Sequence, residues 1–226
     1  MRRAAANAIF HRERSLPPKS EGADVGLERA ELADDPIDQF RSWFADAEAH
    51  PAIAQANAMC LSTLGEDGHP QGRIVLLKGV EDGGFVFYTN LDSAKGRALR
   101  IHPRAALTFH WEPLGRQVRV QGGVEPVSPE EADAYFASRP RGSQVGAWAS
   151  DQSQPLGGRD QLLRRVEELE QRYAGRDVPR PPHWSGFRVR PGSIEFWQAG
   201  EYRLHDRFRY DRGGSSGVWV VTRLNP

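Results

Sequence analysis

The chain has 226 residues, and its 30 Lys and Arg are balanced by 30 Asp and Glu. A formal net charge of zero excludes a bulk basic field of the kind that holds nucleic acid or an anionic membrane surface. The single cysteine, Cys60, excludes an intramolecular disulfide and favours a reducing compartment. No apolar stretch approaches the length of a membrane span, and charged residues interrupt the first apolar run too early for a signal peptide. We therefore expect a cytoplasmic protein.

The chain divides at about residue 35. Residues 1–34 are charged and punctuated by Pro and Gly without a clear period, which predicts a mobile arm. Asp35 followed by Pro36 predicts the start of a helix, because Asp caps helices and Pro favours their first position. Residues 35–226 are expected to form one domain.

A succession of strands follows this first helix. Apolar runs separated by turn residues predict strands over residues 58–64, 71–80, 85–89, 105–111 and 117–127. Ser93 predicts the cap of a short helix, and Ser128 to Glu131 have the pattern of a capping box for a helix to about residue 138.

The last third of the chain continues the pattern. A polar helix is expected over residues 161–173, and strands over 187–189, 193–198, 208–210 and 218–224. Strands follow one another through hairpins and do not alternate with helices. The fold class is therefore mainly β, an antiparallel barrel with peripheral helices rather than a parallel sheet.

Several common catalytic motifs are absent from the sequence. It contains neither G-x-G-x-x-G nor G-x-x-x-x-G-K-[ST], so neither a Rossmann nor a P-loop site is indicated. The histidines are scattered and no cysteine pair exists, so we expect no metal site. Residues 213–217 match G-x-S-x-G, but a strand rather than a helix follows them, and we interpret them as a turn.

Cations and hydrogen-bond donors gather in four stretches, at residues 73–78, 93–95, 135–143 and 203–207. The first, Arg73-Ile74-Val75-Leu76-Leu77-Lys78, is either a core strand with solvated ends or a strand whose two cations flank an anion such as phosphate. Side chains alternate along a strand, so two residues five apart share a site only if the chain bends between them.

Several cationic stretches in a neutral protein suggest that more than one phosphate is bound, since arginine forks suit phosphate. The alternative for each single arginine is an ordinary solvated residue. Trp197 either stacks on a planar ligand ring or fills the core of the sheet.

Five motifs, in their order along the chain, resemble those of the pyridoxine/pyridoxamine 5′-phosphate oxidase family. They are Arg73 to Lys78, Phe87 to Asn90, Ser138 to Trp148, Gln152-Ser153, and Ile194 to Gln198 with Arg203 to Arg207. The resemblance covers about residues 35–226. It implies an FMN-binding split β-barrel that forms a homodimer, with both active sites at the subunit interface.

The resemblance also implies the roles of individual residues. The cofactor FMN would contact Arg73, Ile74, Val75, Leu76, Leu77, Lys78, Tyr88, Thr89, Lys95, Gln117, Gln152, Ser153, Trp197 and Arg207. The substrate would contact Lys78, Tyr135, Arg139, Ser143, Arg203, Leu204 and His205, with Arg203 and His205 as the catalytic residues against its pyridine ring. Ala94 stands where many relatives have an arginine before the lysine, so one contact to the flavin phosphate is missing.

The implied reaction is the FMN-dependent oxidation of pyridoxamine 5′-phosphate and pyridoxine 5′-phosphate to pyridoxal 5′-phosphate, with O2 as acceptor and H2O2 as by-product. Three alternatives remain: an oxidase for another ring system such as a phenazine precursor, a flavin-binding module without turnover, and a deazaflavin-using reductase. Tyr135, Arg139 and Ser143 disfavour the first, because a substrate without phosphate would not need them. The segment 203–207 disfavours the second.

Overall fold

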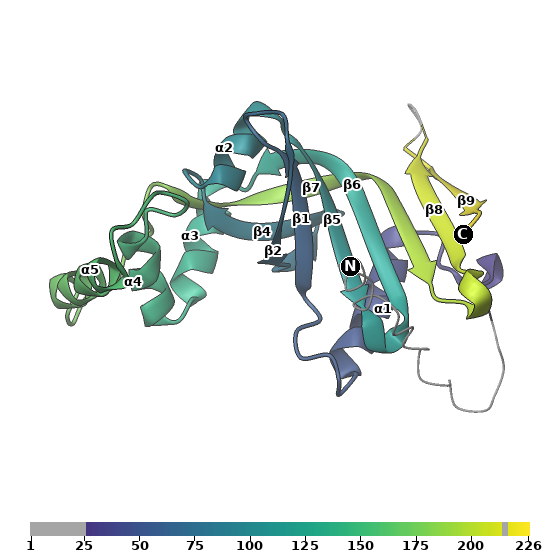
Figure 1. Cartoon of the computed structure of the whole chain (residues 1–226), viewed down its shortest axis with the longest axis horizontal. Coiled ribbons are helices and arrows are strands. Elements are labelled where there is room, and N and C mark those ends of the chain that lie inside the picture. Colours follow the sequence, from purple (N-terminus) through teal and green to yellow (C-terminus); the bar gives the residue numbers. More distant parts are fainter. Residues whose placement is uncertain (1–25, 214–216) are drawn as a thin grey trace, which may run out of the picture.

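The structure is a computed structural model that describes residues 26–213 and 217–226. Within these ranges, nine strands form one antiparallel sheet (Figure 1). The strands are β1 (Ala58–Leu64), β2 (Pro70–Leu76), β3 (Gly79–Glu81), β4 (Gly84–Asn90), β5 (Arg104–Trp111), β6 (Arg116–Pro126), β7 (Trp184–Gln198), β8 (Asp206–Arg212) and β9 (Trp219–Leu224). The helices are α1 (Pro36–Ala49), α2 (Ala94–Ile101), α3 (Pro129–Ser138), α4 (Arg141–Ala149) and α5 (Arg159–Arg172), with 3-10 turns η1 (Arg29–Glu31), η2 (Glu112–Leu114) and η3 (Glu201–Arg203). The mainly β, antiparallel fold class is confirmed.

Strand β7 organises the sheet. The strand order is β2-β1-β5-β6-β7-β4-β3, and β8 pairs with both β7 and β9. Along one side, β7 pairs with β6 over nearly its whole length. On its other side, β4 pairs with its first part and β8 with its last part. The sheet therefore divides along β7, which runs from the end that carries α3, α4 and α5 to the end that carries β8 and β9 (Figure 1).

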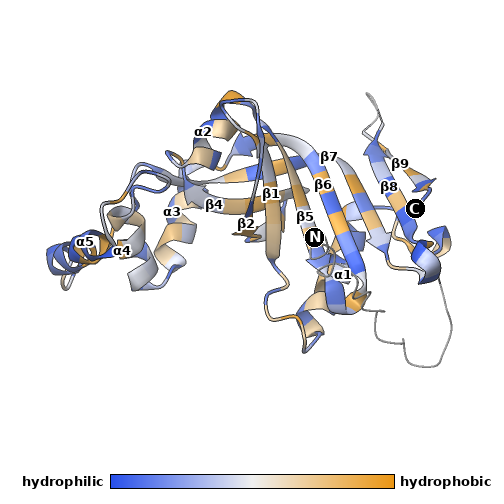
Figure 2. Ribbon diagram, viewed as in Figure 1, coloured by the Kyte–Doolittle hydropathy of each residue, from blue (hydrophilic) through white to orange (hydrophobic). Residues whose placement is uncertain are grey.

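Helix α1 packs against the buried face of the curled sheet and contributes side chains to the main hydrophobic core. Asp35 caps it as predicted, since its side chain accepts a hydrogen bond from Ile37 N at 2.8 Å. Phe40, 1% exposed, packs its ring 4.8 Å from that of Phe85 and 5.0 Å from that of Phe109. Hydrophobic and hydrophilic residues alternate along β6, as expected of a strand with one buried face (Figure 2). Burial of this aromatic cluster stabilises the packing of α1 against the sheet.

A second, smaller apolar cluster lies under the helices at the other end of the sheet. Phe136, Val145, Val178 and Trp184 are buried there, between α3, α4 and the start of β7. Helix α5 has no buried residue of its own and packs on α4 through a few half-buried side chains. This cluster fixes α3 and α4 beside β4 and β7.

Three of the predicted strands differ from the structure. The strand predicted over 71–80 breaks after Leu76, because Lys78 N bonds to Val86 O and the chain changes its pairing partner from β1 to β4. The strands predicted over 187–189 and 193–198 are one continuous strand. Pro191 is accommodated because it lies beside a bulge in β7: Gln121 pairs with Ser193 and Gly122 with Pro191, so Gly192 is the extra residue, and bulges tolerate a residue without an N–H.

Helix α4 and the region before residue 35 also differ from the prediction. Helix α4 was not predicted, because its two glycines lower helix propensity; burial of Val145 and Ala149 stabilises it instead. Of the predicted N-terminal arm, residues 1–25 lie outside the described residues, whereas residues 26–34 pack on the sheet, where Leu27 is 7% exposed. Residues 214–216 of the predicted turn also lie outside the described residues, although β8 and β9 on either side pair as a hairpin.

The described residues contain neither a membrane-spanning helix nor a cluster of metal-binding side chains. No helix in residues 26–213 or 217–226 is long and apolar enough to cross a membrane. Over the same ranges, no three His, Cys, Asp or Glu side chains come together in a way that could hold a metal ion.

Candidate active site

The break between β2 and β3 places Arg73 and Lys78 on different parts of one rim. Arg73 lies opposite Leu61 in the ladder, so its side chain starts from the same face as the fully buried Leu61. Leu77 and Lys78 follow the end of β2, where their N–H groups bond to Asn57 O and Val86 O. The chain thus bends between the two cations, but they do not share one site: Arg73 lies near Lys95, and Lys78 lies near the Tyr135 ring.

Lys95 is the centre of a first polar cluster, at the start of α2. Ser93 caps this helix as predicted, and Lys95 Nζ donates to Thr89 Oγ1 at 3.0 Å, Ser93 Oγ at 3.2 Å and Gln152 Oε1 at 2.8 Å. Burial, and next the charge of nearby Arg73, lower the pKa of Lys95 to about 8. Four predicted cofactor residues therefore lie together, and two of them are cations that repel each other.

A stack of aromatic rings forms a second cluster, beside the first. The Tyr88 and Tyr135 rings lie parallel with centroids 4.0 Å apart, and Trp184 stacks on Tyr88 at 5.3 Å. Lys78 Nζ lies 5.9 Å from the centre of the Tyr135 ring, and the Arg139 guanidinium lies 4.7 Å from that of Trp184. Three predicted substrate residues, Lys78, Tyr135 and Arg139, are thus brought to one place.

The Arg139 guanidinium is partly buried and incompletely hydrogen-bonded. Its Nη1 atom is buried and has no hydrogen-bond partner among the described residues. Burial lowers the pKa of this guanidinium, because the charged form is penalised away from water. Buried polar atoms are normally satisfied, and among the described residues only one other buried side-chain nitrogen, Arg188 Nε, also lacks a partner. Arg139 differs from Arg188 in having no ion pair with a described residue.

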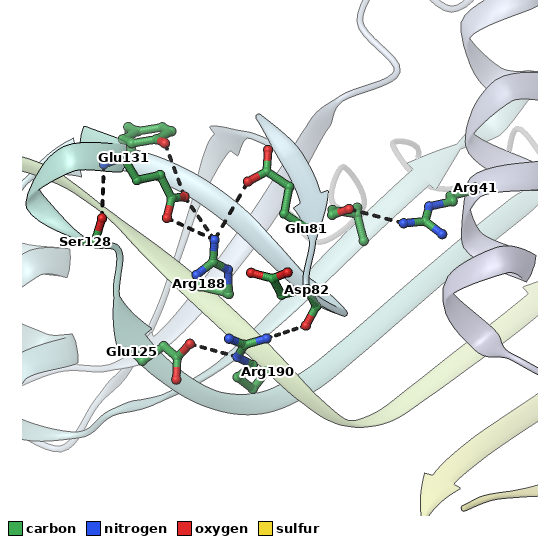
Figure 3. A network of polar contacts seen from close by, with 10 residues as sticks. Arg41, Glu81, Asp82, Glu125, Ser128, Glu131, Arg188 and Arg190 are labelled. Carbon is green, nitrogen blue, oxygen red and sulfur yellow. Dashed lines mark hydrogen bonds and ion pairs between the residues drawn. The ribbon is translucent and has the colours of Figure 1, made fainter. Parts of the chain in front are cut away.

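The anchor of α3 is a feature that the sequence pattern did not reveal. Arg188 on β7, 8% exposed, donates through Nη2 to both carboxylate oxygens of Glu131 at 3.0 Å, and Glu81 lies at 3.8 Å (Figure 3). Tyr88 also donates to Glu131 at 3.5 Å; burial first, and then this carboxylate, raise the Tyr88 pKa to about 12. The sequence pattern predicts only a capping role for Glu131. In the structure its backbone N–H donates to the capping Ser128 Oγ, whereas its carboxylate pairs with Arg188.

A third cluster forms where β6, β7 and β8 run side by side. Trp197 is paired with Gln117 on one side and with Arg207 on the other, so all three side chains lie on one face. The His205 ring lies 4.6 Å from that of Trp197, and its Nδ1 accepts a hydrogen bond from Gly200 N at 3.2 Å. This bond leaves the hydrogen of a neutral His205 on Nε2.

Arg203 projects from a strained turn beside this third cluster. Tyr202 and Arg203 both have left-handed backbones, with φ of 52° and 63°, which non-glycine residues adopt rarely. Gly200 allows the turn to close, because a Cβ there would lie 2.0 Å from Leu204 O. Arg203 is exposed and forms no ion pair with a described residue. Strain of this kind clusters at ligand sites.

The remaining predicted residues lie around these clusters. Ile74 and Leu204 are 67% and 68% exposed, Ser143 is exposed near the start of α4, and Ser153 has a left-handed φ of 71° beside Gln152. Val75 and Leu76 are half-buried, and Leu77 is buried. None of these placements adds a contact between the clusters.

Within one chain, the third cluster is far from the other two. Gly186, which pairs with Tyr88, and Trp197 lie eleven positions apart on β7, roughly 35 Å along the strand. Figure 1 shows the same separation, with α3 and α4 at one end of the molecule and β8 at the other. The structure therefore brings the predicted residues together within each cluster but does not bring Arg203 and His205 to Tyr135 and Arg139.

The residues predicted to bind anions differ from the other cations of the chain in their ion pairing. Most described arginines that are at least partly buried form ion pairs, as Arg116, Arg180 and Arg207 do. Among the described residues, three partly buried cations have no carboxylate within ion-pair distance. They are Arg73, Lys95 and Arg139, all predicted to contact phosphate.

A curled antiparallel sheet with a few helices defines this chain as a half-barrel protein, and its half-buried cations without acidic partners mark the candidate site. A family model described as pyridoxamine 5′-phosphate oxidase matches residues 45–173, and one described as the pyridoxine 5′-phosphate oxidase C-terminal dimerisation region matches residues 184–226. The chain belongs to the pyridoxine/pyridoxamine 5′-phosphate oxidase family, as the resemblance in its motifs predicted.

Curated relatives and solved structures agree with this membership. A pyridoxine/pyridoxamine 5′-phosphate oxidase of Myxococcus xanthus is 57% identical over 200 residues, 88% of this chain and 96% of the relative. One from Synechocystis is 54% identical over 201 residues, 89% and 92% of the two chains. The crystal structure of PhzG from Burkholderia lata, in complex with tetrahydrophenazine-1-carboxylic acid, superposes with a TM-score of 0.82 at 31% identity, covering 91% of this chain and all of that one.

Proposed function

We propose that this protein is an FMN-dependent oxidase that converts pyridoxine 5′-phosphate and pyridoxamine 5′-phosphate to pyridoxal 5′-phosphate with O2 as acceptor. Family membership supports the reaction. The observation that carries the proposal is the set of three partly buried cations without acidic partners, at two neighbouring places. FMN and the substrate each bring one phosphate, so two anion sites are what this reaction needs.

The first anion site fits the phosphate of FMN. Arg73 and Lys95 lie close enough for their charges to interact, and burial lowers the pKa of both. An anion between them removes their repulsion and compensates for the lost hydration. Thr89 and Gln152 add neutral groups that already bond to Lys95. A bound flavin supplies the hydride acceptor that protein side chains lack.

The second anion site fits the phosphate of the substrate. Arg139 offers a buried Nη1 hydrogen without a partner, and Lys78 and Tyr135 lie beside it. Ser143 follows Arg139 at the start of α4, whose N-terminal N–H groups favour an anion. A phosphate held at a fixed place determines where the reacting carbon of the substrate lies, which is the main contribution of such residues to the rate.

The third cluster completes the site from a second copy of the chain. Arg203 and His205 lie too far from Arg139 along β7 to contact one small substrate in the same subunit. The match to a dimerisation region over residues 184–226 includes both residues and supports a homodimer. In the proposed dimer, Trp197 and Arg207 of one subunit reach the flavin held by Arg73 and Lys95 of the other.

The residues of the third cluster then orient the substrate ring. Arg203, exposed and without an ion pair to any described residue, contributes a fixed positive charge against the ring and its oxygen substituents. His205 holds its hydrogen at Nε2, because Nδ1 accepts from Gly200 N, so it donates to a substrate oxygen. Closure of the site by the second subunit excludes water from these contacts and strengthens them.

The likeness to PhzG makes oxidation of a phenazine precursor the second candidate. An aromatic carboxylic acid without phosphate leaves the Arg139, Lys78 and Tyr135 group without its anion at the observed place. The unpartnered Arg139 Nη1 therefore favours the phosphorylated substrate.

The test compares pyridoxine 5′-phosphate with unphosphorylated pyridoxine as substrates of the FMN-loaded protein in air. Aldehyde and peroxide formation with the phosphorylated compound alone is expected. The Arg139→Ala variant should raise KM for the phosphorylated compound by about a hundredfold, since a charge-assisted bidentate contact contributes about 3 kcal/mol. Equal turnover of both compounds, or none with FMN bound, would contradict the proposal.

A further inference from the structure

Residues of β1 and β2 hold the Arg73 side chain in place, and the role inferred for them rests on the proposed binding of FMN. Arg73 forms four hydrogen bonds, all to neighbours on β1 and β2. Its Nη1 donates to Thr63 Oγ1 at 2.7 Å, Leu61 O at 3.1 Å and Gln71 O at 3.0 Å. Its Nη2 donates to Gln71 Oε1 at 3.0 Å. The guanidinium is therefore held firmly without any contribution from a ligand.

All four acceptors are uncharged. A carboxylate at any of these places would cancel the charge of Arg73 and compete with an incoming anion. A hydroxyl, an amide and two carbonyl oxygens fix the orientation of the guanidinium and leave its charge intact. Apart from Arg139, every other half-buried arginine in the described part of the chain has an acidic partner, as Arg207 has in Glu195.

The donors that remain on Arg73 match one phosphate. A guanidinium has five N–H groups, and the observed contacts use both hydrogens of Nη1 and one of Nη2. The Nε hydrogen and one Nη2 hydrogen have no partner among the described residues. Two donors on one planar group are what a bidentate contact to phosphate needs.

Thr63 and Gln71 lie where they can hold the Arg73 guanidinium in one orientation. Thr63 lies on β1, is 5% exposed, and is the cross-strand partner of Gln71 on β2. Arg73 is two positions further along β2, so its side chain folds back over this pair. The short bond from Arg73 to a buried hydroxyl restricts the torsions of a long side chain that would otherwise sample many rotamers.

We propose that Thr63 and Gln71 are positioning residues for the cofactor phosphate. They hold the Arg73 guanidinium through neutral acceptors, so that its charge and its two remaining donors stay directed at the phosphate of FMN. In this assignment Thr63 and Gln71 act only through Arg73, to which both side chains are bonded. Their contribution is therefore confined to the preference of the protein for FMN over riboflavin, which lacks the phosphate.

The experiment measures the dissociation constants of FMN and riboflavin by quenching of flavin fluorescence in Thr63→Val, Thr63→Ser and the wild-type protein. Valine has nearly the shape of threonine without the acceptor. T63V should bind FMN about tenfold more weakly, as expected for a lost hydrogen bond to a charged group, with riboflavin affinity unchanged. T63S keeps the hydroxyl and should restore the wild-type ratio.

Two further variants complete the design. Thr108→Val, on β5 and without a bond to Arg73, is the matched control and should leave the ratio of the two constants unchanged. Gln71→Met removes the second side-chain acceptor at a half-buried position and should weaken FMN selectively, whether or not T63V folds. An unchanged FMN-to-riboflavin ratio in T63V or Q71M would overturn the inference alone. A wild-type protein without preference for FMN would overturn the proposed function as well.

Discussion

At the scale of single residues, the site is recognised by cations that have no acidic partner. Arg73, Lys95 and Arg139 each bear the cost of burial, which lowers their pKa values, and none has a carboxylate within ion-pair distance among the described residues. Buried Arg188 of the same chain differs from them, because its Nη2 donates to both carboxylate oxygens of Glu131. The difference separates the three cations proposed to bind ligands from those that pair with acidic residues of the chain.

The lowered pKa of Lys95 predicts a pH dependence of cofactor binding. Free protein loses the Lys95 proton near pH 8, whereas a bound phosphate favours the charged form, so binding takes up a proton above that pH. FMN affinity should be constant below about pH 7.5 and fall by up to about tenfold per unit above pH 8. Titrations of flavin fluorescence between pH 6.5 and 9 measure this.

The Lys95→Arg variant is the control for this titration. Arginine stays charged throughout the range, so the fall in affinity above pH 8 should disappear. Riboflavin, which has no phosphate, should show no such fall with either protein. A wild-type affinity for FMN that stays constant up to pH 9 would contradict the role assigned to Lys95.

At the scale of elements, helix α3 holds the proposed substrate residues, and one ion pair fixes its position on the sheet. Glu131, Tyr135 and Arg139 are spaced by four, so they follow one side of the helix and its C-terminal cap. The ion pair between Glu131 and buried Arg188 fixes the first of them to β7 (Figure 3). Gly186 leaves room for the Tyr88 ring against which Tyr135 stacks. Substrate residues on a helix are thus aligned by the sheet beneath it.

Glu131→Gln should therefore weaken both stability and substrate binding. Loss of the carboxylate leaves a buried arginine with only Glu81 at 3.8 Å, and roughly 3 kcal/mol of unfolding free energy should be lost. Urea unfolding measures this loss. KM for pyridoxine 5′-phosphate should rise while the FMN dissociation constant stays the same, because α3 carries the substrate residues and not Arg73 or Lys95.

Glu125→Gln is the matched control, from the same region of the molecule. Glu125 pairs with Arg190 at 2.8 Å, but both side chains are more than 40% exposed. An exposed ion pair contributes less than about 1 kcal/mol, so E125Q should change neither stability nor KM appreciably. Equal effects of E125Q and E131Q would indicate that the pair at Arg188 has no special function.

At the scale of the whole molecule, the length of β7 separates two halves of the proposed site. A strand that pairs with β4 at its beginning and with β8 at its end cannot bring both partners to one small ligand. Two copies of the chain in antiparallel association would place each half against the complementary half of the other copy. Exposed Ile74 and Leu204, which belong to the two halves, are suitable contacts for such an interface.

Complementation between two inactive variants tests this arrangement. Arg139→Ala and Arg203→Ala homodimers should each have little activity, because every site lacks one residue. A heterodimer of the two, purified through different affinity tags, has one site with both defects and one intact site. It should regain about half of the wild-type turnover, as two-fold symmetry requires. A heterodimer as inactive as its parents would show that each site is built within one subunit.

The sequence by itself determined the strands, the caps and the chemical character of the site. Alternation of apolar residues and local hydrogen bonds at Asp35, Ser93 and Ser128 act over a few residues, so they can be predicted from the pattern. The motifs also predicted which cations bind phosphate, and three of these cations are the half-buried ones without acidic partners.

Only the tertiary structure decided how these pieces are combined. Helix α4 depends on burial of Val145 in a cluster that includes Trp184, about forty residues away, and the continuity of β7 depends on a bulge at Gly192 within that strand, where it pairs with β6. The anchoring of Glu131 by Arg188, and of Arg73 by Thr63, joins residues on different elements. Contacts of this kind leave no local pattern, because burial and charge pairing depend on which surfaces meet in the folded chain.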